Sequence, residues 1–159
     1  MPGFTHIDKQ GEVRMVDVTA KALTSRVAVA QGVVAMNPDT FESIMNQTAK
    51  KGNVLETARI AGIMAAKKTS ELIPMCHPLN ITHIKIDFFP EHTTTSIRIE
   101  ALAGIVGQTG VEMEALTAVS VAALTIYDMC KSTDREMRIS DIYLLEKSGG
   151  KSGKFLRGK

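Results

Sequence analysis

The first stretches with a regular hydrophobic pattern predict a strand and a short helix. Residues 26–36 are rich in β-branched side chains and end at Asn37-Pro38, which is typical of a strand. The following sequence, Asn37-Pro-Asp-Thr40, is a helix-start signal. We therefore expect a strand over 26–36 and a short helix over 41–47.

A second helix is predicted over residues 54–71. Asn53 can cap its first turn, and Glu56 completes a capping-box-like pattern. Small side chains are frequent in this segment, which allows another helix or strand to approach closely. They are Ala58, Ala61, Gly62, Ala65 and Ala66.

Pro74 and Pro78 then interrupt the chain and force an extended or turned segment. Beyond them, apolar and polar residues alternate over 84–88 and again over 97–101. This alternation predicts an antiparallel hairpin with one solvated face.

Residues 110–131 form one long apolar stretch with charges only at its ends, which predicts a helix. Residues 138–147 predict a last strand with a bulge near Ser140-Asp141. The order strand, helix, helix, strand, strand, helix, strand favours an α+β fold. We expect a ferredoxin-like plait, with a largely antiparallel sheet and helices packed on one face.

Composition is ordinary for a soluble globular protein. The 159 residues, 44% hydrophobic and 23% charged, predict a single domain over 1–159, with about 1–20 and 148–159 mobile. No export signal or apolar run long enough for a membrane is apparent. We expect a cytoplasmic protein that binds no membrane, with Cys76 and Cys130 as reduced thiols.

Charge is unevenly distributed along the chain. The net charge is +2, yet the five residues Lys147, Lys151, Lys154, Arg157 and Lys159 close the chain without any acidic residue. The remainder is slightly acidic, and only 4% of residues are aromatic. Both features argue against nucleic-acid binding. Neither feature excludes binding of a small phosphate-bearing ligand.

The charges at the ends of the long helix are candidates for chemistry. Asp128 and Lys131 are three residues apart and share a face, which would suit proton transfer and phosphate binding. Glu112 and Glu114 stand at the other end. The alternative is that the acids and Lys131 merely complement the helix dipole.

The length of this helix constrains the site. About 14 residues separate Glu114 from Asp128, which is roughly 20 Å along a helix axis. A small substrate could hardly reach both ends. If all these charges serve one site, its two halves must come from different subunits of a homo-oligomer.

Other single residues have both a functional and a structural interpretation. His77 lies between two prolines that would hold it in place, although lone histidines are more often structural. Lys51 precedes a helix N-terminus, where anions are favoured, although surface lysines are usually just solvated. Taken alone, Asp17 is consistent with a turn residue, and Arg26 is consistent with a charge at the edge of a strand. No metal-binding spacing is present.

Six blocks of the sequence, in one register over almost the whole chain, resemble the family of cyclic pyranopterin monophosphate synthases, molybdenum cofactor biosynthesis protein C. The blocks are Met15-Val-Asp-Val-Thr19, Thr57-Ala-Arg-Ile-Ala-Gly-Ile63, Leu72-Ile-Pro-Met-Cys-His-Pro-Leu79, Thr109-Gly-Val-Glu-Met-Glu-Ala-Leu116, Ala122-Ala-Leu-Thr-Ile-Tyr-Asp-Met-Cys-Lys131 and Lys147-Ser-Gly-Gly-Lys-Ser-Gly153. The resemblance implies conversion of 3′,8-cyclo-7,8-dihydro-GTP to cyclic pyranopterin monophosphate and pyrophosphate.

The resemblance also implies roles for the residues named above. Asp128, Lys131, Lys51 and His77 would be catalytic, with Asp128 as acid/base. The substrate would be held by Met75, Cys76, His77, Met113, Glu114, Glu112, Asp17, Arg26 and Lys147.

The family further implies a homohexamer, a trimer of dimers with sites at subunit interfaces. It implies no metal site and no required cofactor, although Mg²⁺ could accompany the triphosphate. The alternative to a synthase is a non-catalytic nucleotide-binding or regulatory oligomer, which would need the lysines and the pocket but not Asp128.

Overall fold

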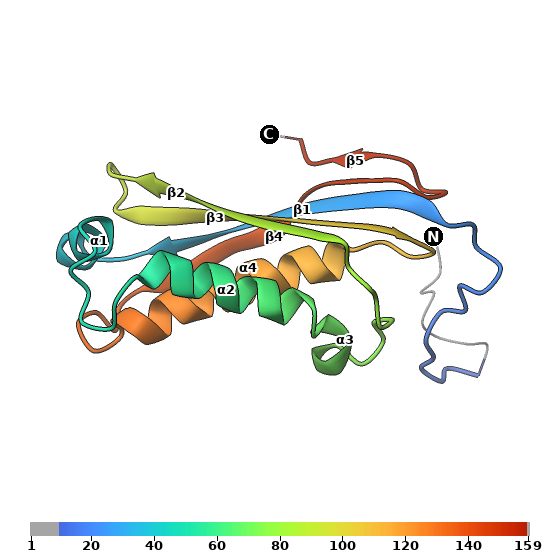
Figure 1. The fold of residues 1–159 in the computed structure, drawn as a ribbon, viewed down its shortest axis with the longest axis horizontal. Helices are drawn as coiled ribbons and strands as arrows, with labels where there is room; N and C mark the ends of the chain where they lie inside the picture. The colour runs from blue at the N-terminus through green and yellow to red at the C-terminus, as the bar shows by residue number, and fades with distance from the viewer. Residues whose placement is uncertain (1–9, 159) are drawn as a thin grey trace.

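The computed structural model describes residues 10–158 and shows one antiparallel sheet with helices on one face (Figure 1). Its strands lie in the order β2-β3-β1-β4-β5. The elements are β1 (Thr24–Ala35), α1 (Pro38–Met45), α2 (Val54–Ala66), α3 (Thr69–Leu72), β2 (His83–Glu91), β3 (Ser96–Gly107), α4 (Glu112–Cys130), β4 (Arg138–Ser148) and β5 (Phe155–Leu156). The predicted α+β plait is confirmed.

The central strand β1 pairs with β3 on one side and with β4 on the other. Its register with β3 is unbroken from Thr24↔Gly107 to Ala35↔Ser96. Its register with β4 shifts twice, once between Gln31 and Val33 where Ser140 lies opposite. Asp141 has a positive φ of 54° at that point. The bulge expected near Ser140-Asp141 is therefore confirmed.

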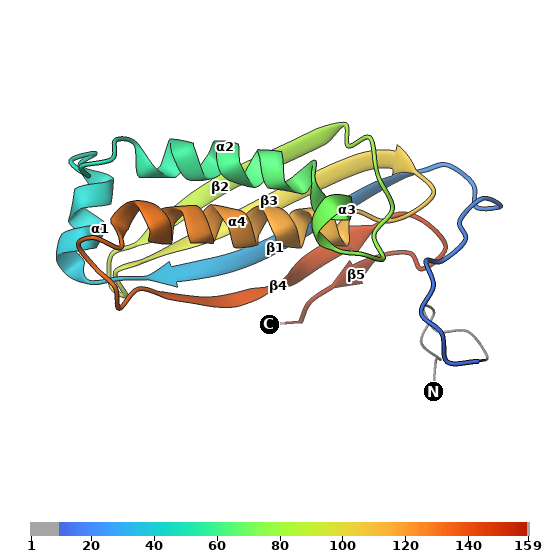
Figure 2. The same ribbon diagram turned by 90° about the horizontal axis from the view of Figure 1, so that it is seen from below.

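The long helix α4 packs on the sheet beside α2 (Figure 2). Gly62 allows the close contact between them, because a Cβ there would lie 2.8 Å from the carbonyl oxygen of Ala118 and 3.3 Å from the Cβ of Ala122. The small residues of α2 thus have the packing role that the sequence suggests. By length and composition α4 could also span a membrane, but half of it is buried inside the fold, as in the core helix of a soluble protein.

Helix caps form where the sequence places them. Asn37 Oδ1 accepts a hydrogen bond from Thr40 N at 2.8 Å, and Asn53 Oδ1 accepts one from Glu56 N at 3.1 Å. Pro38 occupies the first turn of α1, where a missing N–H costs nothing. The carboxylate of Glu56 pairs with Arg59 at 3.2 Å.

The predicted helix over 54–71 is in fact two helices. Helix α2 ends at Ala66, and α3 begins at Thr69. The Thr69 hydroxyl donates a hydrogen bond to the Ala66 carbonyl at 2.9 Å, and Lys68 N reaches back to Ala65. A side chain that takes up a backbone carbonyl competes with continuation of the helix. The turn directs the chain toward Pro74.

The chain after β4 folds back as a hairpin. Residues 155–156 pair with Lys147 and Glu146, so β5 is a short edge strand that the sequence analysis did not predict. Among residues 10–158, no helix covers the sheet face opposite α2 and α4 (Figure 1). Strand alternation places Val29 and its partner Leu102 on that face, and Val106 there is 61% exposed.

Candidate functional site

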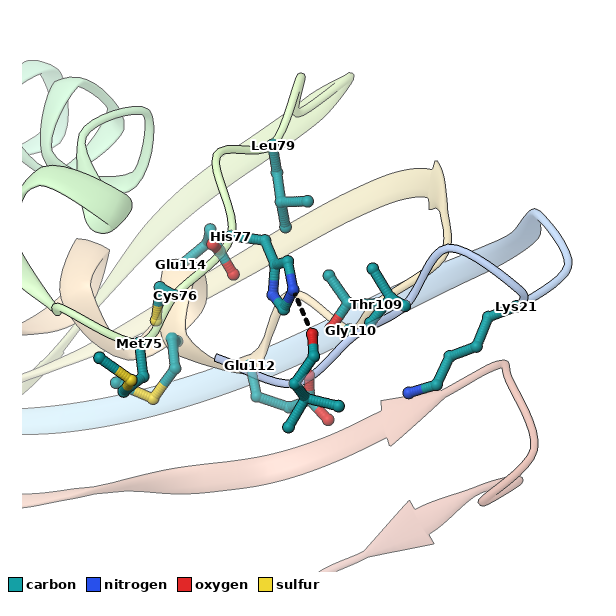
Figure 3. Close-up of a pocket in the computed structure, with 12 residues that line it drawn as sticks. Lys21, Met75, Cys76, His77, Leu79, Thr109, Gly110, Glu112 and Glu114 are labelled. Atoms are coloured by element: carbon teal, nitrogen blue, oxygen red, sulfur yellow. Dashed lines mark hydrogen bonds between the residues drawn. The ribbon is translucent and has the colours of Figure 1, made fainter. Parts of the chain in front are cut away.

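A cavity of about 270 Å³ lies at the N-terminal end of α4 (Figure 3). The N-terminal segment, the loop after α3, the loop after β3 and the first turn of α4 form its walls. The residues that line it are Val16, Val18, Lys21, Met75, Cys76, His77, Leu79, Thr109, Gly110, Glu112, Met113 and Glu114. We call it the α4 N-terminal cavity.

His77 is held in the wall of this cavity by the chain around it. One ring nitrogen, Nε2, lies 2.8 Å from the carbonyl oxygen of Val16, drawn as the dashed line in Figure 3. The preceding turn is closed by a hydrogen bond from Cys76 N to Ile73 O at 3.0 Å. The ring of His77 is thus fixed by Val16, and the role expected of the two prolines stays a prediction.

Glu114 is the buried acid of the cavity. It is 4% exposed, and burial together with the nearby charge of Glu112 raises its pKa to about 6 despite an opposing backbone hydrogen bond. Burial, and the charge of Glu114 to a smaller extent, also raise the pKa of the Cys76 thiol. Glu114 therefore titrates near neutral pH, while Cys76 stays a thiol at neutral pH.

Glu112, in the lining of the cavity, forms an ion pair with Lys147. Lys147 Nζ lies 2.9 Å from Glu112 Oε1 and donates a hydrogen bond to Ser152 Oγ at 3.1 Å. Each charged side chain of the pair is less than a third exposed. The pair joins the start of α4 to the end of β4, and the hydrogen bond to Ser152 continues to the turn after β4.

A second cavity, of about 470 Å³, adjoins the first and shares Lys21 with it. Three cationic side chains line it, those of Lys21, Arg26 and Lys151. Its other lining residues are Ala20, Ala22, Thr24, Gly150 and Ser152. No acidic residue is among them, so this cavity favours anions.

The opposite end of α4 carries the predicted acid–lysine pair. Lys131 Nζ donates a hydrogen bond to Asp128 Oδ1 at 2.6 Å. Lys51 Nζ lies 3.5 Å from Asp128 Oδ2 and donates to the Asp128 carbonyl oxygen at 3.0 Å. The hydrogen bond from Lys131, its charge and the charge of Lys51 lower the pKa of Asp128. The carboxylate is therefore ionised at neutral pH and has two cations beside it.

The structure thus divides the sequence-predicted residues between the two ends of α4. The N-terminal cavity is lined by Met75, Cys76, His77, Glu112, Met113 and Glu114. Arg26 lines the second cavity, and Lys147 pairs with Glu112. Lys51, Asp128 and Lys131 gather at the C-terminal end. Glu112 and Asp128 are 16 residues apart on this helix, or roughly 24 Å. One chain does not bring the two groups together.

Asp17 lines neither of the two cavities. Its carboxylate accepts a hydrogen bond from Thr19 N at 2.9 Å, which closes its own turn. Its neighbours Val16 and Val18 line the first cavity instead. Hydrogen bonding by the side chain of Thr19, and then by its main chain, lowers the pKa of Asp17.

Sequence reasoning missed Lys21, although it borders both cavities. Nothing in its local pattern distinguishes it from a surface lysine. Thr109 and Gly110 were quoted only within a family block, and they line the first cavity. A glycine beside a helix start was the available signal, since backbone there can approach a ligand closely. Within residues 10–158, no three His, Cys, Asp or Glu side chains gather in a way that could hold a metal ion.

Comparison with known proteins identifies the family of this chain. The sequence model of the MoaC family matches residues 15–150. A cyclic pyranopterin monophosphate synthase of Desulfatibacillum aliphaticivorans is 65% identical over 98% of both chains. That of Desulforapulum autotrophicum is also 65% identical, over 98% of this chain and 96% of its own. That of Syntrophomonas wolfei is 59% identical over 97% of this chain and 98% of its own.

Among solved structures, that of AtUAH in complex with (S)-hydroxyglycine overlaps 87% of this chain and 30% of that chain. Its sequence identity is 12% and its TM-score 0.39, which is too weak a likeness to bear on fold or function. The family match includes the whole lining of the first cavity and both ends of α4, and the curated relatives cover 97–98% of the chain. The chain belongs to the MoaC family.

Proposed function

We propose that this chain converts 3′,8-cyclo-7,8-dihydro-GTP to cyclic pyranopterin monophosphate and pyrophosphate, an early step of molybdenum cofactor biosynthesis. Relatives that are 57–65% identical over almost its full length are named as this synthase. The structural observation that carries the proposal is the pair of adjoining cavities that share Lys21, one containing a buried acid and the other lined only by cations among its charged residues. A base and a triphosphate on one substrate need two such neighbouring environments.

The α4 N-terminal cavity suits the base of the substrate. Glu114 can accept hydrogen bonds from ring N–H and exocyclic amino groups, and with a pKa of about 6 it can also exchange protons near neutral pH. His77 contributes an imidazole ring in the same wall. Met75 and Met113 supply flexible apolar surface for a planar ring.

The cationic cavity suits the triphosphate. To close the cyclic phosphate, a hydroxyl oxygen of the substrate bonds to the α-phosphorus. At the same time the bond breaks between the α-phosphorus and the oxygen that bridges it to the β-phosphorus. The hydroxyl proton passes to a base, and pyrophosphate leaves with the bonding electrons. Lys21, Arg26 and Lys151 can neutralise the charge that develops on that leaving group. Lys147 stands beside them, next to Glu112.

Asp128, Lys131 and Lys51 supply the proton-transfer group. The ionised carboxylate of Asp128 can accept a proton, and the ammonium groups beside it can return one or bind a phosphate oxygen. Ring opening and reclosure need several such transfers. We assign Asp128 as acid/base, with Lys131 and Lys51 assisting it.

The site is complete only across a subunit interface. The two groups lie roughly 24 Å apart on α4, so a second subunit must bring its Asp128 end to the cavity of the first. The uncovered apolar sheet face with Val29, Leu102 and Val106 gives the chain a surface for self-association. We propose the homohexamer of the family, a trimer of dimers.

The proposal extends to cofactor, partners and compartment. No resident cofactor or metal is needed, because the chemistry consists of proton transfers and displacement of pyrophosphate, although Mg²⁺ could accompany the triphosphate. The partner is the nucleotide-derived substrate, with no nucleic acid and no membrane. Free thiols at Cys76 and Cys130 suit the cytoplasm.

Incubation of the purified protein with 3′,8-cyclo-7,8-dihydro-GTP tests the proposed function. Mass spectrometry should detect both pyrophosphate and the cyclic pterin product. Tight binding of the substrate without pyrophosphate release would instead support the non-catalytic nucleotide-binding oligomer, in which the cations of the second cavity only hold phosphates.

A further inference from the structure

The turn after β4 lies directly against the guanidinium group of Arg26. Gly149 and Gly150 both have positive φ, 95° and 72°, a conformation that favours glycine. A Cβ added at Gly150 would lie 2.7 Å from Arg26 Cζ and 2.9 Å from Nη2, which is closer than real side chains approach. At Gly149 the obstacle is backbone, with Arg26 Cα 3.1 Å away.

Arg26 is held from its other side by the end of β3 and the loop that follows it. Its Nε donates a hydrogen bond to the Gly107 carbonyl at 2.9 Å, and its Nη2 donates to the Gln108 carbonyl at 3.0 Å. The guanidinium therefore lies between those carbonyls and the glycine turn. A group added at Gly150 could be accommodated only if the guanidinium moved away from them.

The same loop connects Arg26 to the N-terminal segment. The side-chain amide of Gln108 donates hydrogen bonds to the carbonyl oxygens of Thr19 and Lys21, at 3.2 and 3.1 Å. Lys21 is the residue that both cavities share. The contacts run from the glycine turn and Arg26, which line the second cavity, through Gln108 to Lys21, which lines both cavities.

We infer that Gly150 is a positioning residue. Because it has no side chain, the turn after β4 can hold the Arg26 guanidinium in the wall of the second cavity, the one lined by cations. The inference rests on the proposed function, in which that cavity binds the pyrophosphate part of the substrate. Gly150 touches no phosphate in this role; it acts through Arg26. The sequence around it, Gly150-Lys151-Ser152, matches the end of a P-loop. The first glycine of that pattern is absent, because Leu145 stands five residues before Gly150, and no helix follows among the described residues.

The chain offers a matched control at Gly153. This residue lies in the same hairpin and has a similar positive φ of 66°, but a Cβ there meets no atom within 4 Å. Gly153→Ala therefore reports the backbone strain of an alanine in this hairpin, and Gly150→Ala reports that strain plus the collision with Arg26. The difference between the two variants isolates the contact.

The test is a double-mutant cycle in the full-length protein, with inorganic pyrophosphate as the probe in titration calorimetry. Gly150→Ala and Gly153→Ala are each made alone and together with Arg26→Ala. Gly150→Ala should weaken pyrophosphate binding about tenfold more than Gly153→Ala does. In the Arg26→Ala background the two alanines should have equal effects. In the synthase assay Gly150→Ala should lower kcat/KM more than Gly153→Ala does, through kcat as well as KM, because Arg26 also faces the charge that develops on the leaving group.

Two results would overturn the inference. One is equal pyrophosphate affinity of Gly150→Ala and Gly153→Ala when Arg26 is present. The other is a Gly150→Ala effect that persists undiminished without Arg26, which would mean that the turn itself, and not the guanidinium, is disturbed. Thermal melting of the four variants gives the same cycle for stability without any ligand. Absence of turnover by the wild-type protein would refute the proposed function, and the binding cycle would still decide the role of Gly150.

Discussion

Lys51 Nζ donates a hydrogen bond to the main-chain carbonyl of Asp128 at 3.0 Å and lies 3.5 Å from its carboxylate. The first contact satisfies a carbonyl in the last turn of α4, where a cation is favoured by the helix dipole. The second contact places a mobile positive charge beside the proposed acid/base. Because both side chains are about half exposed, the ion pair itself adds little to stability. The role that we propose for it is in binding and catalysis.

Replacement of Lys51 by alanine should therefore affect ligands more than folding. We expect Lys51→Ala to weaken binding of the triphosphate substrate about tenfold or more, and to change binding of an analogue without the triphosphate much less. Calorimetric titration of both ligands measures this. Lys50→Ala, next to it and also exposed, is the control and should change neither. Equal losses for the two ligands would exclude the phosphate role of Lys51.

Asp128→Asn should separate binding from chemistry. The amide keeps the size of the side chain but cannot accept a proton, so turnover should fall by about 10²- to 10⁴-fold while the oligomer and substrate affinity change little. Quenched-flow measurement of pyrophosphate release gives kcat. Asp87→Asn removes another exposed aspartate that is paired with a lysine, here Lys85 at 2.7 Å, and should leave kcat unchanged. Undiminished turnover in Asp128→Asn would remove Asp128 from the mechanism.

Glu114 should make stability depend on pH. Its pKa rises from 4.5 to about 6 in the folded chain, so the folded state holds this proton more tightly than the unfolded state does. The free energy of unfolding should therefore fall as pH rises from about 4.5 to 6, by about 2 kcal/mol, and its contribution should stay level above that range.

Urea unfolding between pH 4 and 8 measures this effect. Glu114→Gln keeps the shape of the side chain but does not titrate, so the decline should disappear in this variant. Glu71→Gln, an exposed glutamate on α3, serves as the control and should retain it. A wild-type curve that matches the Glu114→Gln curve would show that this carboxyl is not perturbed by its environment.

Gly62→Ala should destabilise the fold without touching either cavity. A Cβ at this position meets the Ala118 carbonyl at 2.8 Å, so α2 must move away from α4, at a cost of about 1–3 kcal/mol. Ala61→Ser on the same helix is half-exposed and should cost less than ~0.5 kcal/mol. Chemical denaturation measures the free energy of unfolding of both variants. If Gly62→Ala leaves that free energy unchanged, the two helices are not in close contact.

The fold was largely predictable because its signals are local. The caps Asn37 and Asn53, the alternating hairpin and the long apolar helix each depend on neighbours in sequence, and each appears in the structure. The break after Ala66 was missed because a threonine inside a helical pattern gives no clear sign that its hydroxyl will bind a backbone carbonyl.

The site was predictable only in part, since its groups meet through tertiary contacts. Asp128 and Lys131 are three apart on one helix, so their pairing follows from sequence. The ion pair of Glu112 with Lys147 joins residues far apart in the chain, and no local pattern predicts it. The same is true of Lys21, whose position between two cavities depends on Gln108.

The most direct test of a shared site is activity in mixed oligomers of two inactive variants. One variant carries Asp128→Asn and the other Glu114→Gln, so each has lost a different end of α4. If every site combines the two ends from different subunits, random 1:1 mixing should restore about a quarter of the sites to wild-type composition. Oligomers unfolded and reassembled together should then release pyrophosphate from 3′,8-cyclo-7,8-dihydro-GTP at about a quarter of the wild-type rate. Well-mixed oligomers that stay inactive would contradict the account, because a site within one subunit cannot be restored by mixing.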